Sequence, residues 1–275
     1  GKSPFPEDEP GPERTGVYTT GIVSRTAAHD IALYFTGRRH AGENLGRVLK
    51  ERAAALPPPV QMCDALSHNV AGEFDAIVAN CIAHARRKFV EVAASFPEQC
   101  RYVLETLREV YRNDARTRAE QMSPEQRLAY HQEHSGPLMR GLQWSLYEQL
   151  QQRKVEPNST LGGAVNYLLK HWGKLTRFLE TPGAPLDNNL CERALKKAII
   201  HRKNSLFYKT ENGAAVGDLF MSLIYTAELN RVDPFDYLVQ LQRHATAITA
   251  DPASWMPWKY RDTLAGCGSG TDPPG

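Results

Sequence analysis

Residues 16–36, GVYTTGIVSRTAAHDIALYFT, are the stretch that decides the fold class of this chain. Gly16–Ser24 and Ile31–Thr36 are rich in β-branched and aromatic residues, and a short polar link separates them. This pattern is typical of two strands joined as an antiparallel pair. The leader at residues 1–13 is rich in proline and charge and has no periodicity, which predicts disorder.

The segments that follow add a helix and two short buried strands. Residues 41–55 have helical spacing of apolar side chains, and Pro57–Pro59 end that helix. Val60–Cys63 is an apolar run that stops at Asp64, which suits a buried strand with a carboxylate at its end. A brief helix then precedes residues 76–80, AIVAN, a second strand of this kind. Strands that alternate with helices in this order predict an α/β core.

From about residue 82 the pattern changes to helices only. Apolar side chains recur at helical spacing through residue 180, and those of residues 161–178 form one stripe that we expect in the core. Further helices are predicted at 187–203, 214–229 and 234–248. The predicted organisation is a disordered leader, the first part of the core, a helical insertion, a core helix with C-terminal helices, and a disordered tail: 1–13, 14–81, 82–185, 186–264 and 265–275.

Composition sets broad limits on function. The 275 residues are 41% hydrophobic and 23% charged, as in a soluble globular protein. No apolar run approaches the roughly 18 residues of a membrane span, and no signal peptide is evident. The 5 cysteines are scattered, which favours reduced thiols in a cytoplasmic protein. A net charge of +2 is too small to indicate a nucleic-acid partner, so any such partner has to be inferred from local clusters.

Asp187–Arg193, DNNLCER, carries the strongest chemical signal. Glu192 opens a basic run without acidic residues that holds Arg193, Lys196, Lys197, His201, Arg202, Lys203 and Asn204. On a helix, the apolar residues of this segment share one face and Glu192 lies with the cations on the opposite face. One reading is a metal-bound acid held against a polyanion. The other is a structural helix, in which Asn189 and Glu192 form a capping box and the last cations complement the helix dipole.

Asp64 and Glu192 are the two carboxylates that we pair as catalytic residues and metal ligands. Two divalent ions about 3.5–4 Å apart need several oxygen ligands, and Mg²⁺ favours carboxylates together with substrate phosphate. The structural alternative for Asp64 is a turn-former or helix cap.

The segment after the last strand contains a second basic cluster. Arg86, Arg87 and Lys88 suit contacts with DNA phosphates, and a solvated helix face explains them equally well. Cys81 and His84 have the C-x-x-H spacing of one pair of zinc ligands. A structural zinc site needs a second pair of ligands, and no second pair in the sequence stands at the spacing that such a site needs.

The chain resembles the transposases of the insertion-sequence 66 family from residue 14 to about 264. The matching segments are RTGVYTTGIVS at 14–24, QMCDALSHN at 61–69, NCIAHARRKF at 80–89, HSGPLM at 134–139, LDNNLCERALKKAIIHRKNSLFYKT at 186–210, GDLFMSLIYTAELNRVDPFDYL at 217–238 and WMPWKYRDTL at 255–264. The combination of DNN-x-x-E-R with H-R-K-N is specific to that resemblance.

The resemblance implies a ribonuclease H-like fold, with a mixed sheet and an Asp-Asp-Glu triad. Asp64 corresponds to the second acid and Glu192 to the third, and residues 82–185 correspond to the family's large all-helical insertion. The family's first aspartate lies on a strand upstream of GVYTTG. We therefore expect a C-terminal fragment that lacks the first strand, the first aspartate and the N-terminal DNA-binding regions.

The implied activity is strand cleavage and strand transfer on double-stranded DNA, at transposon ends and target. A complete site would hold two Mg²⁺ or Mn²⁺ ions, and the two basic clusters would contact DNA. We expect the chain alone to be inactive, cytoplasmic and associated with the nucleoid, without a membrane partner; homo-oligomerisation stays open. The alternatives are a non-catalytic DNA-binding or assembly module derived from a transposase, and a helical interaction protein.

Overall fold

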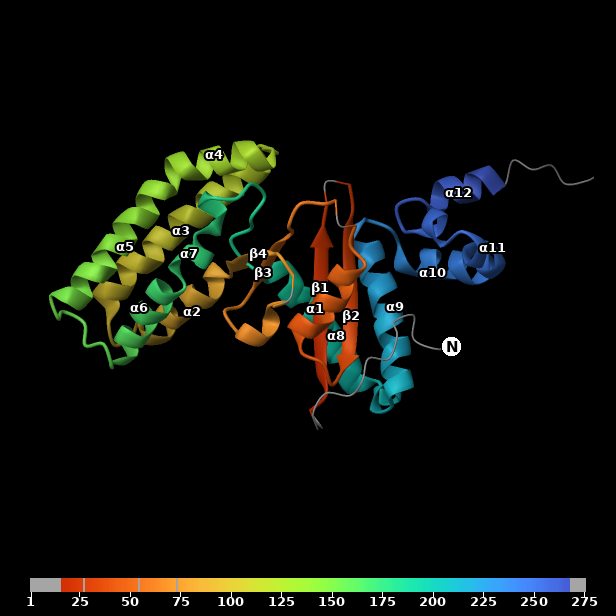
Figure 1. Cartoon of the computed structure of the whole chain (residues 1–275), viewed down its shortest axis with the longest axis horizontal. Coiled ribbons are helices and arrows are strands. Elements are labelled where there is room, and N and C mark those ends of the chain that lie inside the picture. The colour runs from red at the N-terminus through yellow and green to blue at the C-terminus, as the bar shows by residue number, and fades with distance from the viewer. Residues whose placement is uncertain (1–15, 27, 54, 73, 268–275) are drawn as a thin grey trace, which may run out of the picture. The chain divides into compact units, whose positions relative to one another are not determined.

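The computed structural model describes residues 16–26, 28–53, 55–72 and 74–267, so the predicted leader lies outside the described residues. The chain divides into two compact units (Figure 1). Unit 1 contains the residues up to Asn44 and those from Asn189 onward, and unit 2 is Leu45–Asn188. Helix α1 (Ala41–Lys50) contains the first boundary between them.

Unit 1 is built on an antiparallel ribbon of β1 (Tyr18–Arg25) and β2 (Asp30–Gly37), in which Gly21 is opposite Tyr34. This confirms the strand pair predicted from residues 16–36. The remaining elements of unit 1 are helical: α8 (Asn189–Asn204), the 3-10 helix η3 (Leu206–Lys209), α9 (Glu211–Leu229), α10 (Pro234–Arg243), α11 (Ala245–Ala250), the 3-10 helix η4 (Pro252–Trp255) and α12 (Tyr260–Cys267).

Helix α8 lies against β1 through the apolar stripe that its sequence predicts. Ala194 and Ala198 are buried, and the Cys191 thiol donates to the Gly21 carbonyl at 3.0 Å. A Cβ at Gly21 would lie 3.8 Å from the Leu195 Cα, an ordinary van der Waals contact, so the strand and the helix are in direct contact at this point. The Tyr34 hydroxyl donates to the Ala194 carbonyl at 3.0 Å and ties β2 to the same helix.

Helix α9 covers the edge of β2 that β1 leaves unpaired (Figure 1). Backbone N–H groups of β2 donate to side chains of α9, Ala32 to Thr226 at 3.0 Å, Tyr34 to Ser222 at 3.0 Å, and Thr36 to Asp218. The acceptor side chains are four residues apart on α9, a rise of about 6 Å, and the donating N–H groups are two residues apart on β2, a rise of about 6.6 Å. The acceptors and donors therefore have nearly the same spacing. The helix therefore satisfies donors that an open edge would expose.

The C-terminal helices of unit 1 form their own small core. Tyr237, Trp255 and Tyr260 are buried together in it. The predicted helix at 234–248 is instead two helices, with the break at His244, and α12 continues to Cys267, inside the segment predicted as a tail. Residues 268–275 lie outside the described residues.

Unit 2 contains a parallel pair of short strands, β3 (Val60–Cys63) and β4 (Ile77–Asn80). The helix expected near 68–76 is only a 3-10 turn, η1 (Ser67–Asn69). The rest is helical: α2 (Ile82–Val92), α3 (Pro97–Ala119), α4 (Pro124–His134), α5 (Gly136–Gln151), α6 (Thr160–Lys170), α7 (Trp172–Leu175) and the 3-10 helix η2 (Arg177–Leu179).

The core of unit 2 runs through these helices and includes Phe89, Leu107, Leu142 and Leu168. The stripe predicted at 161–178 is buried, but it belongs to α6, α7 and η2 rather than to one continuous helix. None of the helices in the described ranges is long and apolar enough to cross a membrane.

The described residues thus form a mixed α/β structure that is mostly helical, with two small sheets. The division into units at Asn44 and Asn188 does not coincide with the predicted division into core and insertion at residues 81 and 185. That division, like the ribonuclease H-like arrangement of the strands, stays a prediction.

Candidate functional site

Asp64 is the first residue after β3, at the end where both parallel strands of unit 2 stop. It is half-buried, and the Asn69 side-chain amide donates to its carboxylate. The Cys81 N–H donates to the Cys63 carbonyl at 3.0 Å, so the residue after β4 lies beside the end of β3. Ligands of open α/β sheets bind outside the carboxyl ends of the strands, which is where Asp64 stands.

Two thiols lie behind this edge. Burial, followed by the charge of Asp64, raises the pKa of the Cys63 thiol to about 11, while the positive charge of Lys174 opposes the rise. Burial likewise raises the pKa of Cys81. Both thiols are therefore protonated at neutral pH, and Cys63, Cys81, Cys100 and Cys191 are all free, in line with the expected reduced state.

Asp187 is a carboxylate near this edge that the sequence analysis treated only as the start of a helix. The Asn188 N–H donates to the Cys81 sulfur at 3.3 Å, and the Ile82 N–H donates to the Leu186 carbonyl at 3.0 Å. These bonds hold Asp187 beside the end of β4. Burial, and then the nearby Asp187 charge, raise the pKa of the Tyr111 hydroxyl. The position of Asp187 depends on the contact between Asn188 and Cys81, which are 107 residues apart in sequence. A local sequence pattern does not reveal such a contact.

Glu192 lies in the first turn of α8, in unit 1, and is half-buried. The helix begins at Asn189, close to its predicted start. Burial raises the pKa of the neighbouring Cys191 thiol to about 11, and Glu192 adds to that rise. Asp64 and Glu192 belong to different units, and their pairing stays a prediction of the resemblance.

The cations of α8 fall into two groups. Lys197 forms an ion pair with Glu228 and lies 4.9 Å from the Tyr225 ring centroid, and half-buried Arg202 donates to the Thr19 hydroxyl at 2.8 Å. These two cations hold α8 within unit 1. The other cations, Arg193, Lys196 and Lys203, are exposed, and so are His201 and Asn204.

The basic cluster of α2 is also divided. Arg86 and Arg87 are exposed, whereas Lys88 is half-buried and its Nζ lies 4.6 Å from the centroid of the Tyr167 ring on α6. Lys88 is therefore ordered against a neighbouring helix, and the two arginines extend into solvent.

Comparison with known proteins identifies the family. The family model described as the IS66 transposase family matches residues 14–216. Similar proteins include the uncharacterized proteins y4jD, y4qI and y4hP of Sinorhizobium fredii (strain NBRC 101917 / NGR234), which are 32%, 32% and 30% identical over 194, 192 and 201 residues. The matches cover 69%, 69% and 68% of this chain but only 37%, 35% and 36% of the relatives. No solved structure matches. The extent of the family match shows that this chain belongs to the IS66 transposase family.

Proposed function

We propose that this chain is the part of a transposase that supplies two carboxylates, Asp64 and Glu192, to metal-dependent phosphoryl transfer on DNA. The observation that carries the proposal is the placement of Asp64 directly after β3, at the carboxyl end of a parallel strand pair, in a member of a transposase family. The half-buried position of Glu192 on a helix with exposed cations supports the second assignment.

The residues fit a divalent ion that prefers oxygen. Asp64 is only half-buried, and the Asn69 amide orients its carboxylate in the way that hydrogen-bonded neighbours orient metal ligands. Carboxylate oxygens suit Mg²⁺ and Mn²⁺. When bound, such ions activate the attacking oxygen and neutralise the charge that develops on the leaving oxygen.

The protein side of the reaction is to bind and position DNA. Arg193, Lys196 and Lys203 are exposed on α8, and Arg86 and Arg87 are exposed on α2. Contacts from these side chains to phosphates supply affinity that does not depend on sequence and that falls with salt. A non-catalytic DNA-binding module would use the same cations to bind DNA. It would differ from the catalytic domain because it would not need to bind metal ions.

The chain spans little more than a third of the length of the relatives it matches. Asp64 and Glu192 are two of the three acids that the resemblance implies, so we propose that residues 1–275 by themselves have little or no Mg²⁺-dependent nicking activity on supercoiled DNA. Robust nicking that Glu192→Gln abolishes would contradict this, since it would mean that another acid completes the site.

Calorimetric titration with Mn²⁺ tests the proposed site. The proteins compared are the wild-type chain, Asp64→Asn and Glu192→Gln, with Glu91→Gln as the control because Glu91 is an exposed acid on α2. We expect both site variants to bind Mn²⁺ roughly tenfold more weakly or worse, since losing even an outer partner of a metal site costs about 10–100-fold in affinity. Isotherms identical to wild type for both variants would reject the metal site.

A further inference from the structure

A further group of mostly basic side chains lies in unit 2, and only one of its members, Lys88, belongs to the predicted DNA contacts. It comes from α2, α6 and α7 of unit 2 and is called here the Lys174 patch: Lys88, Tyr167, Lys170, His171 and Lys174. Lys170 and Lys174 are exposed, and the other three side chains are half-buried. Residues 161–178 were predicted only as a core stripe, because their apolar side chains recur at helical spacing and the polar residues stand between them.

Ring contacts order the inner part of the patch. The ammonium of Lys88 stands 4.6 Å from the centroid of the Tyr167 ring, within the range of a cation–π interaction. The Tyr167 and His171 rings have centroids 4.8 Å apart and are inclined by 56°. Lys88 is thereby held on the surface at a lower cost in side-chain entropy than a free lysine would incur.

Packing places the patch near the ends of the parallel strands. Helix α7, which carries Lys174, packs against β4, and the last residue of β4 is opposite Cys63, the residue before Asp64. Burial raises the pKa of the Tyr167 hydroxyl, and Asp64 is the next cause. The patch therefore borders the carboxylate that the proposed function assigns to metal binding.

The charge of the patch is positive and comes from lysines. Burial, then Lys170 and Lys174, lower the pKa of His171 from 6.5, so this imidazole is neutral at pH 7. Within the described part of the chain, no ion pair involves Lys88, Lys170 or Lys174. Lys170 and Lys174 stand in the last turns of α6 and α7, where a cation complements the helix dipole, whereas Lys88 lies outside the last turn of α2.

We infer that Lys88, Lys170 and Lys174 form a binding site for backbone phosphates of the DNA strand that enters at Asp64. This inference rests on the proposed function and deepens it by naming side chains that would hold the substrate beside the acid. Lysine acts as a point charge toward phosphate, and Tyr167 fixes one of the three charges in place. Tyr167 is a positioning residue here, because it acts through Lys88.

Lysine footprinting on the wild-type chain tests the inference without any variant. Exposed amines are acetylated with and without duplex DNA at low salt, and the modified sites are read by mass spectrometry. Lys154 is the internal control, because it is exposed and precedes the start of α6, whereas Lys170 ends that helix. We expect DNA to protect Lys170 and Lys174 several-fold and to leave Lys154 unchanged.

Salt-dependent DNA binding of variants gives an independent readout. Each lost phosphate contact lowers the slope of log affinity against log salt by about 0.9 for duplex DNA, so Lys170→Gln/Lys174→Gln should lower it by about 1.8. The matched control Lys154→Gln should leave the slope unchanged, and Tyr167→Phe, which keeps the ring, should behave like wild type. Tyr167→Ala should weaken binding by releasing Lys88.

Three outcomes separate this inference from the proposed function. Protection of Lys170 and Lys174 together with the lowered slope supports both. Protection of Lys196 and Lys203 on α8, with Lys170 and Lys174 as reactive as Lys154, overturns the inference and leaves DNA as the substrate. Absence of DNA protection at every lysine overturns both.

Discussion

Among single residues, Asp114 of α3 shows how unit 2 holds a buried charge. It is 4% exposed, Arg127 donates to it at 2.5 Å, Arg118 lies at 2.8 Å and His131 Nε2 at 3.3 Å. Burial alone would raise the pKa of this carboxyl, but His131, Arg127 and Arg118 hold it below the ordinary value. Asp114, His131 and Ser135 are too buried to meet a substrate, so this network fastens α3 to α4.

Removing this carboxylate should destabilise the chain strongly. We expect Asp114→Ala to cost about 3–5 kcal/mol in urea unfolding, because Arg127 would keep a charge with only 20% of its side chain exposed. The control is Glu98→Gln, whose ion pair with Arg101 is largely exposed and should be worth under about 1 kcal/mol.

The same carboxylate gives a pH dependence of defined sign. A depressed folded-state pKa stabilises the fold above the unfolded value of about 3.9 and loses that stabilisation as pH falls through the folded value. The difference in unfolding free energy between wild type and Asp114→Asn should therefore be full at pH 6 and shrink below about pH 4. A difference that grows on acidification would contradict the assigned partners.

The proposed site residues differ in how far sequence indicates them. Asp64 is a candidate because a strand pattern stops at it, and Glu192 because it opens a basic helix. Asp187, Lys170 and Lys174 were not predicted, since their neighbours come from other segments of the chain. Asp187 also lies where the sequence pattern predicts the start of a helix, and Lys170 and Lys174 lie between the apolar residues of the predicted core stripe.

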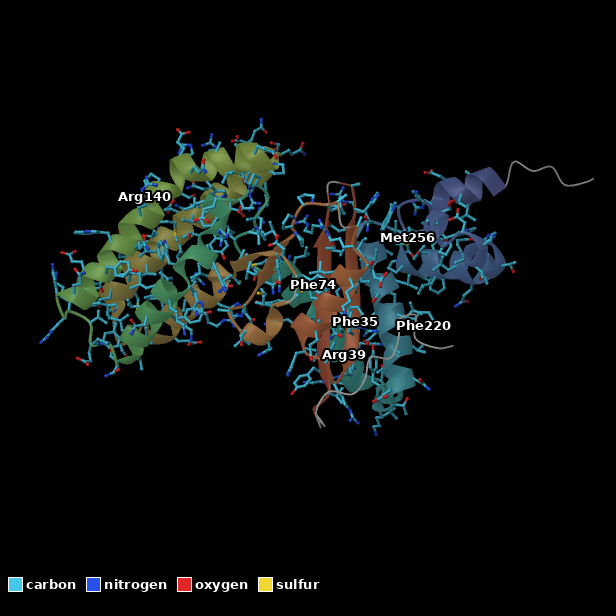
Figure 2. The ribbon with its side chains drawn as sticks, viewed as in Figure 1. Phe35, Arg39, Phe74, Arg140, Phe220 and Met256 are labelled. Carbon is cyan, nitrogen blue, oxygen red and sulfur yellow. The ribbon has the colours of Figure 1, made fainter. Side chains whose placement is uncertain are left out.

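At the scale of elements, the fit of α9 against β2 determines the stability of unit 1. Asp218, Ser222 and Thr226 recur every four residues and receive three N–H groups of the strand. Positions on the other side of the helix are exposed and apolar, including Val216, Leu219 and Phe220, the last labelled in Figure 2. From this pattern alone one would expect the polar residues of the helix to face solvent. In the structure Asp218 and Thr226 are buried against β2 instead.

Thr226→Val tests the sealing of the β2 edge. The substitution keeps the shape of the side chain and removes the acceptor of the Ala32 N–H, so we expect a loss of about 1–3 kcal/mol in unfolding free energy. Thr249→Val on α11 is the matched control, because Thr249 is exposed and bonds only within its own helix, and it should change stability by less than about 0.5 kcal/mol. Equal effects of the two changes would argue against the edge-sealing role.

The cations of α8 should separate into DNA-facing and structural residues. Lys196→Gln/Lys203→Gln removes exposed charges, and we expect the salt slope of DNA binding to fall by about 1.8 with little change in stability. Lys197→Gln/Arg202→Gln removes partners of Glu228 and Thr19, and should lower stability with a smaller effect on the slope. Anisotropy titrations over a salt series and urea unfolding measure the two effects, and reversed effects of the pairs would reject the division.

Most elements were predictable because their apolar periodicity is local. The β1–β2 pair, β3 and β4 lie close to their predicted ranges, and residues 82–180 are helical as predicted. The breaks at His171 and His244 were missed, since neither position carries proline or glycine and the apolar spacing continues across both. The roles of Lys197 and Arg202 were missed because their partners are 31 and 183 residues away in sequence.

For the whole molecule, the central claim is that Asp64 of unit 2 and Glu192 of unit 1 serve one metal-dependent reaction on DNA. Membership of the IS66 transposase family and the strand-end position of Asp64 support it. If this proposal is right, the two acids bind the same metal ions. The position of either acid taken separately does not test that requirement.

Iron-directed cleavage of the polypeptide tests this claim most directly. Fe²⁺ loaded in place of Mg²⁺, with ascorbate and peroxide, cuts the backbone beside the bound metal, and the fragments are mapped by mass spectrometry. We expect cuts near both Asp64 and Glu192, suppressed by excess Mg²⁺, with both cuts lost in either Asp64→Asn or Glu192→Gln. Cuts near only one of the two residues, or a cut near Asp64 that survives Glu192→Gln unchanged, would contradict a shared metal site.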